Sequence, residues 1–599
     1  VYERNPDNGE YLRDDDGNKI YDYGNYRKSS YRGYNFVQSM PYDKNEIKRD
    51  AASVRGYLQV APLKGLTYKM SLSIDYNSKF SHDYTNPTYG KEPLVGSVSK
   101  RNYRTTGMTF NNVVNWEHNF KELHNIRLMA GQEYYEYNTS NFGGSRSGVI
   151  TDGFFEPDAA STLTGFSGNS DQYKLLSYFG SAEYSFNQRY FLSASMRTDG
   201  SSRFHPDNRW GTFWSFGASW KIHQESFMKS VADRWLSNLS LRASYGAQGN
   251  DNVGYYAYQE LYSIGSFLGE TTLHASRLAT PDLSWETNLN FNIGLDFGFL
   301  NNRINGTIDV YHSKTKDLLM SVNIPTLTGY PSTMQNIGQT KNFGVDISLN
   351  VTPIRTEDFE WVSSLNAAYQ KEEIVELANG KNDMIDNKWF IGQSIGVFYD
   401  YAADGIWKES DAAEMAKWNE KGSKFKVGMV KPVDQNGDYQ LDANDDKIIL
   451  GNKTPRWTLG WSNYFTWKGV ELGIELYGRF GYMIETGGEA QAGQFQQREI
   501  DYWTPGNPNA EWQMPIYGSG DSYAGLLGYK DASFLKLRNI SLGYNIPQNI
   551  CKKIGINSLK VYVQGRNLGD IYSSIDYIDL DLGTSYYNRG VTFGLNVGF

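Results

Sequence analysis

The twelve residues from Asp434 to Asp445 carry the side chains that a hard cation requires. Oxygen-bearing side chains fall at relative positions 1, 3, 5, 9 and 12, and a main-chain carbonyl is available at position 7. This is the ligand order of an EF-hand loop, which surrounds Ca²⁺ with about six to eight oxygens. We therefore expect a structural Ca²⁺ site that stiffens this segment. Its ligands would be Asp434, Asn436, Asp438, Gln440, Asp442 and Asp445.

Two positions depart from the EF-hand pattern. Tyr439 occupies the position where glycine usually makes the sharp turn, and Asp445 is shorter than the usual bidentate glutamate. The alternative interpretation is therefore a solvated acidic turn without a metal.

Aromatic side chains gather in the same long loop, 372–455, and in the next one, 482–532. Aromatic faces can stack on sugar rings or hold peptide side chains at the mouth of a binding site. They equally suit packing of the loops against each other or against a partner, so both interpretations stay open. The candidate substrate-binding residues are Trp389, Phe390, Trp407, Tyr502, Trp503 and Trp512.

Catalytic patterns are missing from the sequence. The seven histidines form no His-Glu-x-x-His pair or comparable zinc spacing. The single Cys551 has no partner for a disulfide. We therefore predict that the protein is not an enzyme. With 58 Lys and Arg against 67 Asp and Glu, the net charge of −9 also argues against nucleic-acid binding, which needs a basic face.

The elements that would position these residues are strands with a period of two. From Asn288 to Phe299, apolar residues alternate strictly with Asn, Asp or Gly. This alternation is typical of a strand with one apolar and one polar face. About seventeen such segments are present, most of them long enough to cross a bilayer when tilted. They lie near 51–60, 66–76, 105–118, 124–138, 174–186, 190–199, 211–222, 236–247, 286–299, 303–314, 342–352, 360–371, 456–467, 469–481, 533–546, 558–566 and 589–599.

The connections between these segments alternate between short and long. Short turns on one side and long loops on the other are typical of an outer-membrane barrel, in which the turns are periplasmic and the loops external. A soluble all-β protein is the weaker alternative, because its core would not accept Asn, Asp and Gly along one whole face. The long connections are expected at about 77–104, 139–173, 248–285, 315–341, 372–455 and 482–532.

Trp and Tyr near the ends of strands strengthen this interpretation. Trp214, Trp220, Trp457 and Trp467 lie where an interfacial aromatic girdle would lie. The predicted fold class is therefore all-β: a transmembrane antiparallel β-barrel of the large plugged-transporter type, located in the bacterial outer membrane.

An odd strand count is unexpected for a bacterial barrel that begins and ends in the periplasm. The largest plugged barrels have about 22 strands. We therefore expect residues 1–599 to be the C-terminal part of such a barrel, with about 17 of 22 strands visible and with a plug and about five strands preceding them.

Several motifs, spread over most of the chain from about residue 170 onward, resemble one family, the SusC/RagA-like TonB-dependent transporters of Bacteroidetes. They are 197–204 (Arg-Thr-Asp-Gly-Ser-Ser-Arg-Phe), 208–213 (Asn-Arg-Trp-Gly-Thr-Phe), 241–246 (Leu-Arg-Ala-Ser-Tyr-Gly), 342–346 (Asn-Phe-Gly-Val-Asp), 503–505 (Trp-Thr-Pro), 507–510 (Asn-Pro-Asn-Ala) and 531–539 (Asp-Ala-Ser-Phe-Leu-Lys-Leu-Arg-Asn).

This resemblance implies import of oligosaccharides or peptides, energised by the TonB–ExbBD complex through the missing N-terminal region. It also implies a SusD-like surface lipoprotein that acts as a lid, contact with outer-membrane lipid, and possible pairing of two transporter–lid units. The alternative function is a passive pore or surface-adhesion barrel without energy coupling. The residues leave open whether the substrate is a glycan or a peptide.

Overall fold

The computed structural model describes residues 2, 4–5, 8–20, 39–89, 95–487, 500–514, 521–583 and 589–599. Its main feature is one sheet of seventeen strands, which we call the wall. The wall strands are β1 (Lys44–Leu63), β2 (Leu66–Thr85), β3 (Ser97–Phe120), β4 (His124–Val149), β5 (Ala160–Phe186), β6 (Tyr190–Ser201), β7 (Trp210–Lys221), β8 (Leu236–Asn250), β11 (Glu286–Phe299), β12 (Ile304–Lys316), β15 (Gln339–Arg355), β16 (Phe359–Glu376), β21 (Trp457–Trp467), β22 (Val470–Phe480), β25 (Phe534–Asn545), β26 (Ser558–Ser573) and β27 (Gly590–Gly598).

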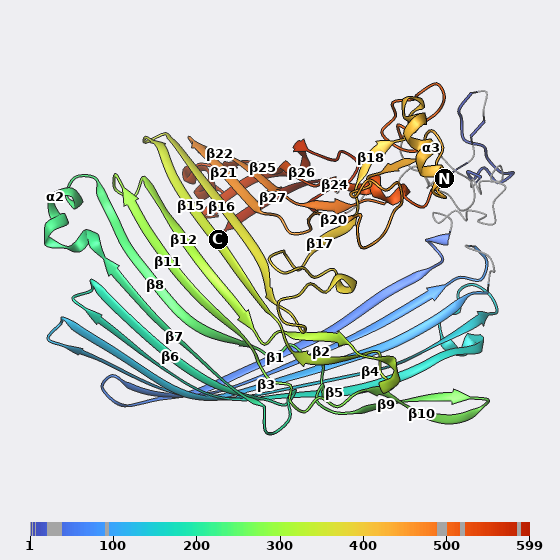
Figure 1. Ribbon diagram of the computed structural model, residues 1–599. Helices are drawn as coiled ribbons and strands as arrows, with labels where there is room; N and C mark the ends of the chain where they lie inside the picture. Colours follow the sequence, from blue (N-terminus) through green and yellow to red (C-terminus); the bar gives the residue numbers. More distant parts are fainter. Residues whose placement is uncertain are drawn as a thin grey trace.

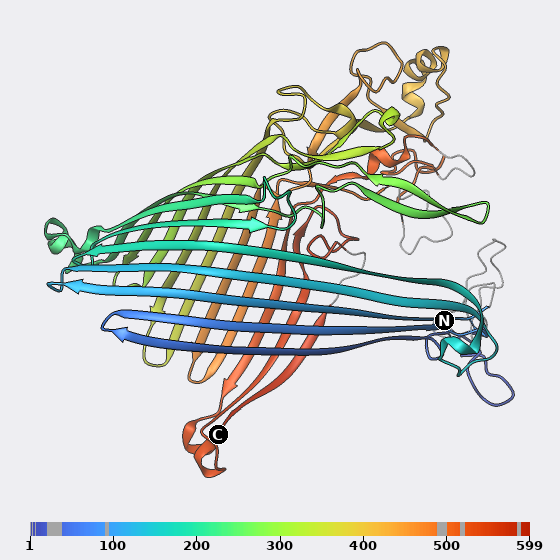
Figure 2. The ribbon, with the colours of Figure 1, turned by 90° about the horizontal axis from the view of Figure 1, so that it is seen from below.

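Each wall strand pairs antiparallel with the next one along the chain, from β1–β2 to β26–β27. The wall is strongly curved, with tight turns at one end of the strands and long connections at the other (Figure 1). In the described ranges, β1 and β27 do not pair with each other, so the sheet has two open edges. Figure 2 shows the strands running side by side across the whole wall.

The prediction of an all-β fold with about seventeen strands is confirmed, because each expected segment lies within or over one wall strand. The expectation of long loops at 77–104 and 139–173 is wrong. Strands β2 to β5 continue through most of both ranges, leaving connections of only 86–96 and 150–159. These strand extensions lie beyond the apolar belt, where water reaches both faces, and therefore lack the alternation that reveals a half-apolar strand.

Smaller elements occupy the long connections and two of the turns. Five two-stranded sheets are formed by β9 (Leu261–Phe267) with β10 (Glu270–Arg277), β13 (Leu319–Asn323) with β14 (Ser332–Asn336), β17 (Val397–Tyr401) with β20 (Lys447–Asn452), β18 (Ala403–Ile406) with β19 (Val430–Pro432), and β23 (Met483–Glu485) with β24 (Tyr529–Asp531). Within the described ranges, the α-helices are α2 (Lys229–Ala232), α3 (Ala412–Glu420) and α4 (Gln548–Lys553), and the 3₁₀ turns are η1 (Pro157–Ala159), η2 (Ile222–Gln224), η3 (Ser226–Met228), η4 (Thr326–Thr328), η5 (Ile385–Asn387), η6 (Glu409–Asp411) and η9 (Ala524–Gly528). None of the helices in the described residues has the length and hydropathy to cross a membrane.

The register gives the wall two chemically different faces. Ala243, Ile293 and Val310 are direct cross-strand partners, so they lie on one face, which we call the outer face. Their chain neighbours Arg242 and Asp309 lie on the opposite, inner face. Ile293 and Val310 are 43% and 39% exposed although both are aliphatic, which is the arrangement expected where lipid covers them.

Aromatic rings follow the outer face at the turn end of the strands. Phe186, Tyr190 and Trp220 form a continuous stacked series on β5, β6 and β7, with ring centroids 6.3 and 6.4 Å apart. His124 extends the series on β4, because its ring lies 4.9 Å from that of Phe186 and its Nδ1 lies 2.8 Å from the Tyr184 hydroxyl. The row matches the aromatic belt at a membrane–water interface.

Candidate functional site

The inner face carries arginine clusters that bridge neighbouring strands. Arg242 of β8 donates from Nε to Asp296 Oδ2 at 2.8 Å and from Nη2 to Asp296 Oδ1 at 3.0 Å. The same Nη2 donates to Asp309 Oδ2 at 3.2 Å, so one guanidinium joins β8, β11 and β12. Gly294 leaves the space for this cluster, since an added Cβ would lie 2.7 Å from Arg242 Nη2 and 2.5 Å from Asp309 Oδ1. Bidentate geometry makes such pairs specific as well as strong.

A second cluster lies around Arg197 of β6. Its Nε donates to Asp199 at 2.7 Å, and its Nη2 donates to Glu133 of β4 at 2.9 Å and to Ser177 of β5 at 2.8 Å. The guanidinium carbon also lies 5.2 Å from the centre of the Phe179 ring. Each cluster sets one guanidinium against two carboxylates, so this part of the inner face is polar with a slight excess of negative charge. Its remaining donors and acceptors are available to a hydrophilic solute or to a protein segment.

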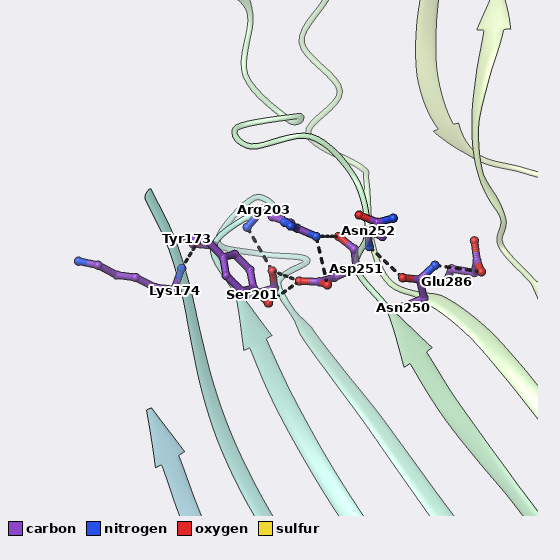
Figure 3. A network of polar contacts seen from close by, with 9 residues as sticks. Tyr173, Lys174, Ser201, Arg203, Asn250, Asp251, Asn252 and Glu286 are labelled. Carbon is purple, nitrogen blue, oxygen red and sulfur yellow. Dashed lines mark hydrogen bonds and ion pairs between the residues drawn. The ribbon is translucent and has the colours of Figure 1, made fainter. Parts of the chain in front are cut away.

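At the loop end of β5 to β8, a polar network centres on Asp251 (Figure 3). Its Oδ2 accepts hydrogen bonds from the hydroxyls of Tyr173 at 2.8 Å and Ser201 at 2.7 Å. Arg203 Nη1 donates to the Asp251 main-chain oxygen at 2.8 Å. Where the connection leaves and rejoins the wall, Asn250 of β8 donates to Glu286 of β11 at 3.3 Å. The network thus ties β5, the β6–β7 loop and both ends of the 251–285 connection together.

Packing around Arg203 and Phe204 reinforces the Asp251 network, and we call the two together the anchor. The Arg203 guanidinium lies 4.6 Å from the centre of the Tyr173 ring, close enough for a cation–π interaction. Phe204 is fully buried in a small core with Val253, Ala257 and Leu283. The anchor therefore fixes where the long 251–285 connection leaves the wall.

The sequence prediction did not assign roles to Arg197, Arg203, Arg242 or Asp251. Arg197 and Arg203 lie in the 197–204 motif, and Arg242 lies in the 241–246 motif. The sequence signal that could have found them is a charged residue on the polar face of an alternating strand. Their ion-pair and hydrogen-bond partners could not be predicted, because these come from other strands and depend on the register between strands.

The connection 377–456 and the described parts of the connection 481–533 pack on each other to form what we call the loop cap. Its core consists of Trp407, Trp418 and Phe425, all of them buried, with Tyr523 packed against them from the second connection. Asp521 of the second connection accepts a 2.7 Å hydrogen bond from the Val430 amide of the first. The cap is thus a small folded unit of its own rather than a set of independent loops.

The six predicted substrate-binding aromatics divide between core and surface. Phe390, Trp407 and Trp512 are 8%, 0% and 2% exposed, whereas Tyr502 is 43% exposed. Trp389 and Trp503 are half-buried. Because Trp407 and Trp512 are enclosed, the structure does not bring the six into one open binding surface.

Some groups near Trp503 lack hydrogen-bond partners. The indole Nε1 of Trp503 and both amide atoms of Gln513 are buried without a partner among the described residues. Trp503 lies directly against Gly428, where an added Cβ would come within 2.5 Å of the ring. Buried polar groups without a partner usually bind water or a ligand, so this part of the cap has unused binding capacity.

A charged hydrogen-bond network joins the two connections of the cap to each other. Asp400 accepts hydrogen bonds from the Tyr529 hydroxyl at 2.9 Å and pairs with Lys447 at 3.2 Å. Partial burial alone would raise the pKa of Asp400, but the hydrogen bonds from Tyr529 and Lys447 outweigh it and lower that pKa. Burial and the Asp400 hydrogen bond together raise the pKa of Tyr529. Asp400 is therefore a fixed anion at neutral pH.

The predicted cation loop folds as a series of side-chain turns. Asp434 Oδ1 accepts hydrogen bonds from the amides of Asn436 and Gly437 at 3.2 and 2.7 Å, and its Oδ2 accepts one from Tyr439 at 2.6 Å. Tyr439 has a φ of +63°, so it adopts the left-handed conformation expected of a glycine at this position.

The carboxylate that closes the loop is that of Asp446. It is fully buried and accepts hydrogen bonds from the amides of Gln435 and Asp442 at 2.8 and 2.7 Å. Asp445, the predicted closing ligand, is exposed. Within the described residues, no three His, Cys, Asp or Glu side chains lie together as a ready-made metal site, so a cation in this loop would also need amide, main-chain or water oxygens.

Comparison with known proteins identifies the architecture. The family described as "TonB dependent receptor-like, beta-barrel" matches residues 2–568. Among curated proteins, the chain is 28% identical to TonB-dependent receptor P26 of Formosa agariphila over 94% of its length, and 32% identical to TonB-dependent receptor SusC of Bacteroides thetaiotaomicron over 79%. A solved structure of the RagAB peptide transporter superposes with a TM-score of 0.83 at 27% identity, covering 98% of this chain and 66% of that one.

The chain is shorter than these relatives. It spans 61% of the Formosa protein and 48% of the Bacteroides protein, or about half to three-fifths of the length of the curated relatives that it matches.

Proposed function

Because the chain belongs to the TonB dependent receptor-like β-barrel family, we propose that it forms most of the wall and the loop cap of an energised outer-membrane importer. The SusC/RagA-like resemblance of its motifs is confirmed by the SusC and RagAB similarities. The protein lies in the outer membrane, and its family consists of receptors and transporters rather than enzymes.

The observation that carries the proposal is the division of the wall into an apolar outer face and a polar inner face. The Arg197 and Arg242 clusters present charged and hydroxyl groups along the inner face of β4 to β12. A hydrophilic solute passing along such a face exchanges water for protein hydrogen bonds at little net free energy. A passive pore would share this face, so energy coupling rests on the family relationship.

We propose oligosaccharides or peptides as the substrates, captured at the loop end under a SusD-like lipoprotein. RagAB is a peptide transporter, and this similarity supports a peptide substrate. The Trp503 and Gln513 groups that have no partner among the described residues suit either class of substrate. Trp389, Tyr502 and Trp503 are the predicted aromatics with accessible surface, so they are the candidates for direct contact. Energy would come from the TonB–ExbBD complex, and pairing of two transporter–lid units remains part of the proposal.

Uptake by cells carrying the full-length protein tests this function. We expect labelled oligosaccharides or oligopeptides to accumulate only when TonB is present and the proton gradient is intact. Accumulation that persists without TonB would favour the passive pore. Single-channel conductance of the purified protein is the second readout, because an open pore conducts ions steadily whereas an occluded importer does not.

We also propose that Ca²⁺ binds the 434–446 turn and stiffens the cap. The successive side-chain turns of Asp434, Asn436, Asp438 and Asp442 orient their oxygens within one loop, and carboxylate oxygens keep lone pairs after accepting an amide hydrogen bond. The test is protection of 434–446 from protease by Ca²⁺ but not by Mg²⁺, with loss of protection in Asp438→Ala. Equal cleavage with and without Ca²⁺ would leave a solvated acidic turn.

A further inference from the structure

The outer face of β4 to β7 carries an apolar groove. It has a volume of about 950 Å³ and a floor of small residues, including Gly180, Ala182 and Ala194. Tyr178 and Met196 border it and are 50% and 59% exposed. A second hollow of about 710 Å³ shares Ala182 and Ala194 and extends the groove toward the turn end. A long hydrocarbon chain would fit this shape.

A polar pocket of about 390 Å³ lies further toward the loop end on the same strands. Its lining includes Arg104, Asn138, Ser140, Ser170 and Gln172. Arg104 pairs directly with Ser140, and Ser140 with Ser170, so these side chains share one face.

The groove and the pocket are on the same side of the wall. Ala130 lines the groove and Asn138 lines the pocket, and the two residues are an even number of positions apart on β4. In a continuous strand, such residues point to the same face. The pocket therefore lies on the same face as the groove and further toward the loop end of the strands.

An aromatic pair separates the two sites. The rings of Tyr178 and Trp210 stack with centroids 6.3 Å apart, and Trp210 is 48% exposed on the outer face. Aromatic rings of this kind mark the boundary between hydrocarbon and headgroups. The groove therefore lies in the hydrocarbon region, and the pocket lies at headgroup level on the external side, where the long connections are.

The charge of the pocket suits an anionic, hydroxyl-rich headgroup. Arg104 is exposed and, within the described part of the chain, forms no ion pair with Asp or Glu. The nearby Glu136 carboxylate is bound by neutral donors, namely Tyr134 at 2.7 Å, Asn138 at 3.1 Å and Gln172 at 2.9 Å. Its charge is offset by Lys174, its direct cross-strand partner on the same face. Thr139 and Asp171 also line the pocket, but adjacent residues on a strand point to opposite faces, so their side chains lie on the inner side. The other side chains of the lining are amides and hydroxyls, which is the chemistry that binds sugars.

We propose that this surface binds a glycolipid of the outer leaflet, with its phosphorylated sugar headgroup in the polar pocket and an acyl chain in the apolar groove. A phospholipid with a small headgroup would fill the groove but leave the pocket amides and Arg104 unused. A second copy of the protein would instead need projecting side chains to fill the groove. The site is separate from the inner face and does not depend on which substrate is transported.

The test is native mass spectrometry of the full-length, delipidated protein titrated with bis-phosphorylated lipid A. We expect Arg104→Ala to weaken binding about tenfold, the usual effect of removing one charged hydrogen bond. Ala194→Phe, which fills the groove, is expected to weaken it at least as much. Arg101→Ala is the matched control, because Arg101 lies on the same strand but faces the inner side, and it should change the affinity by less than about twofold.

Three outcomes would overturn the proposal. These are equal binding of lipid A by wild type and Arg104→Ala, equal binding of lipid A and of phosphatidylethanolamine, and an Ala194→Phe variant that changes from dimer to monomer with unaltered lipid binding. Competition by inorganic phosphate is a further control. Displacement of lipid A by millimolar phosphate would show that the site binds anions in general rather than a glycolipid. Heat-modifiable migration in gels checks that each variant is folded, and unchanged uptake by Arg104→Ala separates this inference from the transport function.

Discussion

The wall and the loop cap are stabilised by different interactions. In the wall, backbone pairing sets the positions of side chains, and the arginine clusters stay partly exposed, with 39% of the Arg242 side chain accessible. In the cap, Trp407 and Trp418 are sealed in a core whose parts come from two connections. Charge pairs in the wall follow from register, whereas the cap depends on packing.

This difference separates the tasks of the two regions. A polar inner face can be lined with charges because neighbouring strands deliver their partners at fixed spacing. A loop end that must present a defined surface needs its own core, since its short strands leave little backbone pairing to hold it. The two regions should therefore respond differently to mutation.

Truncation of the cap core should have the largest effect. Trp407→Ala removes a fully buried ring, and loss of a large core aromatic destabilises by about 3–5 kcal/mol. We expect faster hydrogen exchange throughout 397–452 with no change in the wall strands. Tyr502→Ala, at a position 43% exposed, is the control and should leave exchange unchanged. Equal loosening of cap and wall would show that the two are one cooperative unit.

Gly294→Ala should have the next largest effect, because it disturbs the wall at a crowded position of the inner face. The added Cβ would overlap Arg242 and Asp309, and overpacking of this kind destabilises by about 1–3 kcal/mol. Urea unfolding in detergent measures the change. Gly460→Ala, with no atoms near its added Cβ, is the matched control. Similar midpoints for the two variants would refute the role of Gly294.

Arg242→Ala should be milder, at about 1–2 kcal/mol, because water can solvate the Asp296 and Asp309 carboxylates that it leaves behind. The same urea titration applies. Arg242→Lys is expected to recover only part of the loss, since an ammonium group cannot reproduce the bidentate pair with Asp296. Full recovery by lysine would mean that charge, rather than geometry, matters here.

Acid should loosen the cap by the smallest amount. The pKa of Asp400 is lowered in the folded protein, so its contribution to stability is present above the ordinary aspartate pKa and is lost as the pH falls below about 4. Hydrogen exchange of 397–401, corrected for the intrinsic rate, should rise between pH 5 and pH 3. Asp400→Asn should remove most of this pH dependence, and an unchanged profile would assign the effect to another group.

Strand identity was accessible from the sequence because lipid on one side and water on the other impose alternation. The segment 288–299 illustrates this, since its apolar residues Phe291 and Ile293 lie on the outer face as predicted. The part of β4 beyond about residue 138 could not be predicted, because water on both faces of the strand removes the alternation of apolar and polar residues. The closing role of Asp446 was missed for a related reason: an EF-hand count places the ligand at Asp445, whereas the folded loop turns Asp446 inward.

Period-two alternation, aromatic residues at strand ends and the order of short and long connections determined the all-β wall and its place in a membrane, because each depends only on neighbours along the chain. The tertiary structure decided which charges meet, as in the joining of Arg242 to Asp296 and Asp309, since partners on separate strands depend on register. It also decided that Trp407 is core and Tyr502 is surface. An aromatic residue in a loop suits either environment, and only the folded connections exclude water from one and not from the other.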